Sequence, residues 1–283
     1  MSSQSDQLAH AFRSACLAEI EAIKPGNVHI FADGHGMVVQ DFIRSAEAAS
    51  AVIAQPSITV GQRIFDAVDA TWNTVGCNTN LGVILLCAPI IQAALSGKKS
   101  TLRERLEETL QGLTIGDATL AYRAILKASP AGLGESARYD VHVPPSVTLL
   151  VAMQEAQQRD LIARQYANGF ADVLDGARRY QNTLQRWQRP AWATTAVYLG
   201  FLANFADSHI ARKHGAAVAL AVQEEAKAHE QALLAQDNPK TCQRDLLKFD
   251  ADLKARSLNP GTSADLTVAS FLIASLQSVA VSL

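Results

Sequence analysis

Apolar side chains recur every three or four positions along most of the chain, which is the spacing of amphipathic helices. Residues 6–23 are an example, because Leu8, Phe12, Ala15 and Glu19 fall on one helical face. The same pattern predicts further helices over residues 40–54, 61–74, 83–95, 101–110, 115–128, 145–158, 159–187, 191–206, 208–235, 240–255 and 263–282. Alternating strand patterns joined by turn dipeptides are missing. We therefore expect an all-α fold of about eleven or twelve helices, in a single globular domain over residues 1–283.

One predicted helix differs from the others, because residues 83–95 are apolar on every side. A helix without a polar face is typical of a protein interior, so we expect this one to be the buried centre of the domain. Pro89 lies inside it and has no backbone N–H. It should therefore kink the helix or leave a broken hydrogen bond to be completed by a neighbour.

The polar residues gather in the breaks between helices, and the break after residue 23 is the richest in them. Its polar side chains are those of Lys24, Asn27, His29, Asp33 and His35. Pro-Gly supplies a tight turn there, and further glycines let the backbone approach a ligand without a Cβ in the way. We interpret this loop as one wall of a site. The alternative is a solvated connector.

Glu19 falls on the apolar side of the first helix, one turn before that loop, whereas Glu21 falls on another face. A carboxylate in such a place needs an ionic partner, a metal or a raised pKa. A catalytic role is one interpretation. Simple pairing of Glu19 with Lys24 is the structural alternative.

Asn78, Thr79 and Asn80 stand directly before the most apolar helix. Asn and Thr are preferred N-cap residues, so capping alone would explain them. A helix N-terminus flanked by glycines also offers free N–H groups to an anion. These side chains are therefore candidates for a polar pocket at the edge of the core.

The densest polar cluster begins at Asp207. If Ser208 caps the helix that follows, His209 and Lys213 lie on one face with Arg212 beside them. Basic residues at a helix N-terminus oppose the helix dipole, so something anionic should offset them. A bound polyphosphate would do so, and Asp207 alone is the simpler alternative.

Three further breaks contain polar residues. Asp265 falls in the first turn of the last helix, after Asn259-Pro-Gly-Thr-Ser, where a carboxylate complements the dipole and structural use is the default. Gly116-Asp117 opens another helix. Residues 129–146 form the longest break, and we expect a candidate active-site loop there because apolar helices resume on both sides.

The composition and the missing sequence motifs argue against several classes of protein. A formal charge of −2 argues against a dedicated nucleic-acid-binding protein, which would show a basic stripe. The four cysteines form no C-x-x-C pair, a signal sequence is missing and no apolar run is long enough for a membrane span, so we expect a soluble cytoplasmic protein. Zinc, Walker, Rossmann and serine-hydrolase signatures are missing as well. Scattered carboxylates and amides favour a hard cation such as Mg²⁺, brought in with phosphates.

Taken in order, these segments resemble the triphosphoribosyl-dephospho-CoA synthase family. The resemblance covers about residues 15–275 and runs through these motifs: Glu19…Lys24-Pro-Gly-Asn-Val, Asp33-Gly-His-Gly-Met…Asp41-Phe…Ser45-Ala, Thr74…Asn78-Thr-Asn-Leu-Gly, Asp207-Ser-His…Arg212…Gly215 and Asn259-Pro-Gly-Thr-Ser-Ala-Asp-Leu. Several ordered motifs over nearly the whole chain make the resemblance specific at the level of the family.

The resemblance implies a transferase that joins ATP to 3′-dephospho-CoA, with loss of adenine. A ribose hydroxyl of the acceptor attacks C1′ of the ATP ribose, so the transition state resembles an oxocarbenium ion. One carboxylate would accept the hydroxyl proton and another would stabilise the positive charge, while Mg²⁺ and basic side chains hold the triphosphate. The roles implied are base or stabiliser for Glu19 or Asp33, phosphate contacts for Lys24, Arg212 and Lys213, catalytic Mg²⁺ ligation for Asp207 with Asp265, ribose or base contacts for Asn78 and Asn80, and further nucleotide contacts for Asn27, His35 and His209.

The chain also departs from the family pattern. It has Asn80-Leu81 where the synthases have His-Lys, and Ser208-His209 where they have Thr-Asn. The pattern is similar to a divergent branch in archaea and methylotrophs, whose genes accompany the synthesis of one-carbon cofactors of the tetrahydromethanopterin or methanofuran type. Three hypotheses stay open: the family's transfer to dephospho-CoA or a related precursor, an N-glycosidic hydrolase, and a helical binding protein without catalysis. A homodimer is compatible with each.

Overall fold

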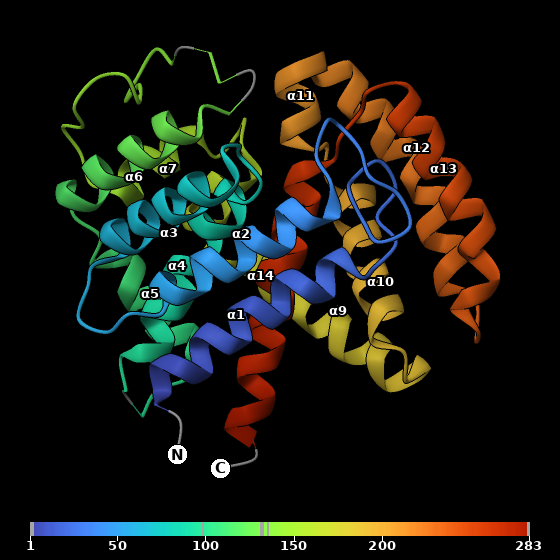
Figure 1. Ribbon diagram of the computed structural model, residues 1–283, viewed down its shortest axis with the longest axis horizontal. Helices are drawn as coiled ribbons and strands as arrows, with labels where there is room; N and C mark the ends of the chain where they lie inside the picture. Colours follow the sequence, from blue (N-terminus) through green and yellow to red (C-terminus); the bar gives the residue numbers. More distant parts are fainter. Residues whose placement is uncertain (1–2, 98, 131–132, 135, 282–283) are drawn as a thin grey trace. The chain divides into compact units, whose positions relative to one another are not determined.

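The computed structural model describes residues 3–97, 99–130, 133–134 and 136–281, and over these residues the fold is all-α, as predicted (Figure 1). The described residues form fourteen α-helices and one 3-10 helix, slightly more than the eleven or twelve predicted. They form no strand, apart from two isolated bridges, His29–Ala32 and Gly34–Met37. The helices are α1 (Gln4–Ile20), α2 (Val39–Ile53), α3 (Val60–Val75), α4 (Leu81–Leu95), α5 (Leu102–Gln111), α6 (Ile115–Ala128), α7 (Leu149–Ala156), α8 (Leu161–Ala167), α9 (Ala171–Trp187), α10 (Pro190–Asn204), α11 (Ser208–His214), α12 (Ala216–Leu234), the 3-10 helix η1 (Pro239–Cys242), α13 (Gln243–Ala255) and α14 (Gly261–Val281).

The extra helices come from breaks that the periodicity did not reveal. The predicted helix over residues 159–187 is two helices, α8 and α9, because Gly169 and Phe170 have φ of 67° and 60°. The predicted helix over residues 208–235 is also two, α11 and α12, separated at Gly215 with φ of 93°. A residue with positive φ cannot continue the i→i−4 ladder, so the helix ends there. The predictions of two continuous helices were wrong.

The chain divides into two compact units, each assembled from segments distant in sequence. Unit 1 contains Met1–Ser14, Phe42–Asp172 and Ser275–Leu283, and unit 2 contains Ala15–Asp41 and Val173–Ala274. Each dividing point falls at or inside a helix, namely α1, α2, α9 or α14. Domains are ordinarily separated by exposed linkers, whereas the chain passes between these two units within helices.

Unit 1 contains the helix predicted to be fully buried. Along α4, every residue from Leu81 to Ile91 is buried, which confirms that prediction. Pro89 cannot donate to the carbonyl of Leu85, its i−4 partner. The hydroxyl of Tyr166, on α8, donates to that carbonyl instead, at 2.6 Å. The broken helical hydrogen bond is therefore completed by a neighbouring side chain, as the position of Pro89 predicted.

Two helices of unit 1, α3 and α6, approach each other closely at Gly61. A Cβ at Gly61 would lie 2.4 Å from the Cα of Asp117, so only glycine fits. Asp117 accepts the Gly61 N–H at 2.7 Å and also completes a capping box with Thr114 at the start of α6. The Gly116-Asp117 break is thus engaged in helix capping and helix packing.

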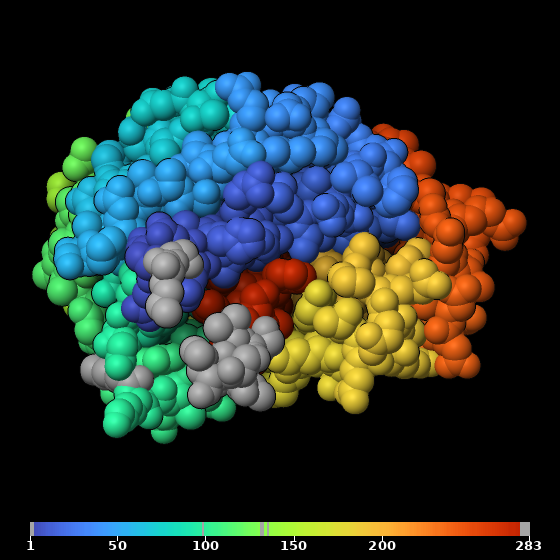
Figure 2. Space-filling model, turned by 60° about the horizontal axis from the view of Figure 1, so that its bottom comes forward, coloured from blue at the N-terminus to red at the C-terminus, as the bar shows by residue number. Residues whose placement is uncertain are grey.

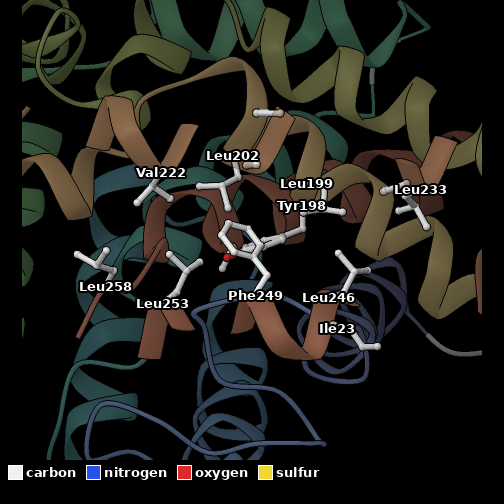
Figure 3. Close-up of a cluster of buried hydrophobic side chains, with 14 of the residues drawn as sticks. Ile23, Tyr198, Leu199, Leu202, Val222, Leu233, Leu246, Phe249, Leu253 and Leu258 are labelled. Carbon is white, nitrogen blue, oxygen red and sulfur yellow. The ribbon is translucent and has the colours of Figure 1, made fainter. Parts of the chain in front are cut away.

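Unit 2 has a core built by α10, α12 and α13 (Figure 3). Each of these helices places apolar side chains at helical spacing, for example Leu246, Phe249 and Leu253 on α13. Figure 1 shows α12 and α13 side by side, with the long loop between α1 and α2 next to them. Tyr198, from α10, lies in this core and its hydroxyl donates to the carbonyl of Pro25 at 2.6 Å. The core therefore supports that loop directly.

The helices present polar faces to solvent, as α9 illustrates. Its buried residues include Val173, Ala177 and Tyr180, whereas Asp175 and Arg178 form an exposed ion pair. The yellow segment that contains α9 lies at the surface in Figure 2. Among the described helices, none combines the length and the apolar character that crossing a membrane requires.

Candidate functional site

The loop between α1 and α2, residues 21–38 and called the Lys24 loop, is buried over its first half. Residues 22–29 are all buried, including the charged side chain of Lys24 and the polar side chains of Asn27 and His29. A solvated connector would expose such residues, since buried backbone and side-chain polar groups require partners. The alternative of a solvated connector therefore does not describe this segment.

A chain of polar contacts links the Lys24 loop to both flanking motifs within unit 2. Lys24 forms an ion pair with Glu19, and its Nζ donates to Oδ1 of Asn27 at 2.8 Å. The amide of Asn27 then donates to Oδ1 of Asn259 at 2.7 Å. All four side chains are at most 7% exposed. Tertiary folding thus joins residue 19 to residue 259 through one network.

Burial dominates the electrostatics of this pair. It raises the pKa of Glu19 and lowers the pKa of Lys24, and the ion pair between them opposes both shifts. The negative charge of Asp265 adds to the stabilisation of the Lys24 cation. Glu19 therefore has the partner that its apolar position demanded, in the form of the structural alternative predicted from the sequence. Pairing does not exclude chemistry, because a buried carboxylate with a raised pKa is also a suitable proton acceptor.

Asp207 joins the beginnings of two helices. Its Oδ1 accepts the N–H groups of His209 and Ile210 in α11, at 2.9 and 3.2 Å. Its Oδ2 accepts the N–H and the hydroxyl of Ser263 in α14, both at 2.8 Å. The carboxylate is fully buried, and burial raises its pKa although these four donors oppose the shift. Asp207, rather than Ser208, is the N-cap of α11.

The basic residues after Asp207 lie elsewhere on the helix than the sequence suggested. Because α11 ends at His214, Arg212 and Lys213 are in its last turn, where the partial negative charge of the helix C-terminus stabilises them. The expectation that they oppose the dipole and therefore require an anion was wrong. His209 still lies one turn before Lys213, and the charges of Arg212, Lys213, His35 and His214 all act on it.

These groups form an accessible basic cluster, composed of His35, His209, Arg212 and Lys213. Lys213 is exposed and the other three are partly exposed. The ring of His209 lies over Gly261 at the start of α14, where a Cβ would be 3.2 Å from Nδ1. His35 hydrogen-bonds through Nε2 to the carbonyl of Gly26 at 2.8 Å, which links it to the buried first half of the Lys24 loop. The cluster therefore borders the buried network described above.

The remaining candidate residues of unit 2 lie at its margins. Asp33 is exposed, and its Oδ1 accepts the N–H of Val39 at 3.0 Å, at the start of α2. The prediction that Asp265 lies in the first turn of the last helix was wrong, because α14 begins at Gly261 and its first turn contains no acidic residue. Asp265 is partly exposed, and its charge acts on Lys24 and on Cys16. No group of three or more His, Cys, Asp or Glu side chains among the described residues could hold a metal ion.

Asn78 and Asn80 belong to unit 1, where both have structural partners. Oδ1 of Asn78 accepts the N–H of Leu81 at 3.2 Å, at the start of α4. Asn80 is the N-cap residue, but its amide donates to the hydroxyl of Thr71 at 3.1 Å. Thr79 donates to Ser45 at 2.6 Å. Their assignment to ribose or base rests on the motif alone and stays a prediction.

The long break over residues 129–146 also lies in unit 1, and residues 131, 132 and 135 of it are outside the described residues. In the described part, Asp140 accepts the N–H groups of Ser136 and His142. These local bonds hold the pKa of Asp140 at about 2, well below its usual range. They account for its conformation, and the proposed role as an active-site loop stays a prediction.

The sequence reasoning did not select Asp250 and Lys254, although both contact the Lys24 loop. Asp250 accepts the N–H of Gly26 at 2.8 Å, and Lys254 donates to the carbonyl of Ala32 at 3.0 Å. A signal was present, because Asp250 falls on the same face of α13 as Leu246, Phe249 and Leu253. A carboxylate at an apolar position, which identified Glu19, identifies Asp250 equally well.

The pKa of His209 gives a direct test of the basic cluster. Burial and the charges of Arg212 and Lys213 lower the pKa of His209 to about 4, from 6.5. The unfolded chain therefore binds a proton at higher pH than the folded one, and His209 loses at most about 3 kcal/mol of its contribution to stability as the pH falls from 6.5 to 4. Histidine titration by NMR should assign the lowest pKa to His209, and His209→Gln should weaken the acid dependence of unfolding. Titration of His209 near 6.5 would contradict this electrostatic description.

The comparisons with known proteins agree with this arrangement of motifs. Residues 5–282 match the family model CitG, described as ATP:dephospho-CoA triphosphoribosyl transferase. A solved structure from Archaeoglobus fulgidus, provisionally named a triphosphoribosyl-dephospho-CoA synthase, has 22% sequence identity and a TM-score of 0.64, over 82% of this chain and 97% of that chain. It has the same fold. No curated protein matches the chain. Because the family model covers nearly the whole chain, the chain belongs to this family of transferases, as the motifs predicted.

Proposed function

We propose that this member of the triphosphoribosyl transferase family carries out its reaction at the Glu19–Lys24–Asn27–Asn259 network and the basic cluster beside it. One observation carries the proposal most strongly. Motifs that begin at residues 19, 207 and 259 meet in unit 2, where buried polar contacts connect them. A scaffold alone would not require a buried ion pair extended by two amides, since a hydrophobic replacement is often as stable.

The reaction proposed is transfer of the triphosphoribosyl group from ATP to a ribose hydroxyl of dephospho-CoA. The bond between C1′ and adenine breaks, and the acceptor oxygen forms a new bond to C1′. The hydroxyl proton passes to a carboxylate. Adenine leaves with the electron pair of the broken bond and takes up one proton on N9, so the protons lost and gained are equal. The triphosphate stays intact, so the protein must bind it without cleaving it.

Glu19 is the stronger candidate for the base. Its raised pKa suits acceptance of a proton from a hydroxyl, and Lys24 stabilises its ionised form before the reaction. Asp33 is exposed and one of its oxygens is engaged at the start of α2. We therefore assign the base to Glu19 and a peripheral role to Asp33.

The basic cluster is the proposed contact for the triphosphate. Arg212 and Lys213 present accessible cationic groups, and guanidinium binds phosphate oxygens in pairs. Lys24 is fully buried and its Nζ faces Glu19 and Asn27, so it supplies positive potential rather than direct contact. A triphosphate analogue such as tripolyphosphate should raise the pKa of His209 by offsetting the neighbouring cations.

Magnesium would enter with ATP, because this ion is ordinarily held by one or two carboxylates and the substrate phosphates. Asp207 does not fit as a ligand, since all four donors around it already occupy its two oxygens. Asp265 is partly exposed in the second turn of α14 and fits a single carboxylate contact. Bound Mg²⁺ would neutralise charge on the triphosphate. We propose that Asp207 positions the starts of α11 and α14, and that the reaction takes place in the cytoplasm, where ATP is available.

The experiment that tests the proposal follows adenine. The purified chain is incubated with Mg·ATP, with and without dephospho-CoA, and the products are separated by chromatography. Adenine formed only with dephospho-CoA supports the transferase. Adenine formed without an acceptor would replace it by an N-glycosidic hydrolase. ATP binding without adenine release would overturn the proposed acceptor, and a one-carbon cofactor precursor would then be the next acceptor to assay.

A further inference from the structure

Two side chains of α13, Asp250 and Lys254, contact the Lys24 loop. Asp250 accepts the Gly26 N–H at 2.8 Å and lies 3.4 Å from Nε2 of His29. Lys254 donates to the carbonyl of Ala32 and to Asp250, each at 3.0 Å. The pair therefore contacts the loop at three points along its length.

Asp250 is buried and has several polar partners. Its side chain is 4% exposed, and burial alone would raise its pKa, but the contacts with His29 and Lys254 hold the pKa below its usual value. The ring orientation of His29 suits this arrangement, because its Nδ1 accepts the N–H of Phe31 at 3.3 Å and Nε2 faces the carboxylate. Each polar group of the pair is aimed at the loop or at its partner.

Close steric contacts also hold the loop against α13. Gly26 has φ of 84°, and a Cβ there would lie 2.8 Å from Pro260 and 3.0 Å from Leu253. A Cβ at Gly34 would lie 3.1 Å from the side chain of Lys254. Gly26 is thus pressed against Leu253 of α13, and its positive φ disfavours any other residue there. At Gly34 a Cβ would require only a small shift of the Lys254 side chain.

The attachment of α13 to its own core does not explain the polar pair. Leu246, Phe249 and Leu253 already pack α13 into the core of unit 2. A second pair on the same helix, Asp245 and Lys248, is exposed to solvent. Thus Asp250 and Lys254 face the loop, whereas Asp245 and Lys248 on the same helix face solvent.

We infer that Asp250 and Lys254 are positioning residues, which fix the Lys24 loop so that Lys24 and Asn27 hold Glu19 and Asn259 in their reactive arrangement. This inference rests on the proposed function. Neither residue touches the reacting atoms, so both act through the loop. Loss of either should lower kcat more than it changes KM, because misplacement of a catalytic group affects the transition state more than substrate binding.

The test uses Asp250→Ala and Lys254→Met, with Asp245→Ala and Lys248→Met as matched controls on the same helix. We expect kcat for adenine release to fall at least about 10-fold in the first two, with KM for ATP within about threefold. Both controls should match the wild type. Because Asp250→Ala empties a buried position, Lys254→Met is the variant that keeps the core intact.

Hydrogen exchange of residues 24–32 supplies a second readout that does not depend on activity. We expect faster exchange in Asp250→Ala and Lys254→Met and unchanged exchange in the two controls. If the wild type is active and the two variants keep its kcat, or if their exchange rates equal those of the wild type, the positioning role is overturned. A wild type that releases no adenine would instead overturn the proposed function, while the exchange data still report on the loop.

Discussion

Glu19→Gln is expected to lower kcat for adenine release by at least about 100-fold, which is the usual contribution of a general base. Glutamine keeps the shape of the side chain but cannot accept the proton of the attacking hydroxyl. It also leaves the cation of Lys24 buried without its counter-ion, which costs about 3–5 kcal/mol of stability. Steady-state kinetics and urea unfolding of the same preparation measure the two effects.

Two further variants separate catalysis from folding. Glu21→Gln removes an exposed carboxylate two residues away and should leave both activity and stability unchanged. In Glu19→Gln/Lys24→Met both buried charges are absent, so stability should recover relative to Glu19→Gln, whereas activity should not. Recovery of kcat in the double variant, or full activity of Glu19→Gln, would show that Glu19 serves the fold alone.

Asp207→Asn is expected to destabilise the protein by about 2–4 kcal/mol. The carboxylate accepts donors on both of its oxygens, two from α11 and two from Ser263. An amide can accept on one side only, so its NH₂ group would face N–H or O–H donors on the other. Urea unfolding measures the loss of stability. The kcat of the variant while it is still folded shows whether activity depends on the position of the starts of α11 and α14.

Asp160→Asn is the matched control for that substitution. Asp160 is also a helix N-cap, and its Oδ1 accepts the N–H groups of Ile162 and Ala163 in α8. An asparagine retains this oxygen and both capping hydrogen bonds, so the loss should be smaller than that of Asp207→Asn. Equal effects of the two substitutions would mean that joining two helices is not the role of Asp207.

Periodicity predicted the helices well where each helix has one buried face and ends at an ordinary cap. The predicted helix over residues 115–128 has the same bounds in the structure, and the fully apolar run became the buried helix α4. It did not reveal the ends that depend on a single backbone torsion. Gly169 and Gly215 lie within periodic stretches, and only their positive φ shows that the helices stop there.

The break at Gly215 also changed an electrostatic argument. Arg212 and Lys213 were expected near the start of a long helix, where they would need an anion nearby. They lie at the end of a short helix, where the dipole stabilises them without one. Missing the helix end at Gly215 therefore reversed the sign of the interaction between these two cations and the helix dipole, although the same residues remained neighbours.

By itself, the sequence determined the helical class, the family and the residues whose polarity conflicts with their apolar surroundings, Glu19 among them. Those properties depend on spacing along the chain, and spacing decides which face of a helix is buried. Only the tertiary structure supplied the distant partners of the buried groups: Asn259 for Asn27 in the Glu19 network, Ser263 for Asp207, and Asp250 with Lys254 for the Lys24 loop. The physical reason is that burial creates the need for a partner locally, whereas packing of distant helices selects the group that meets it.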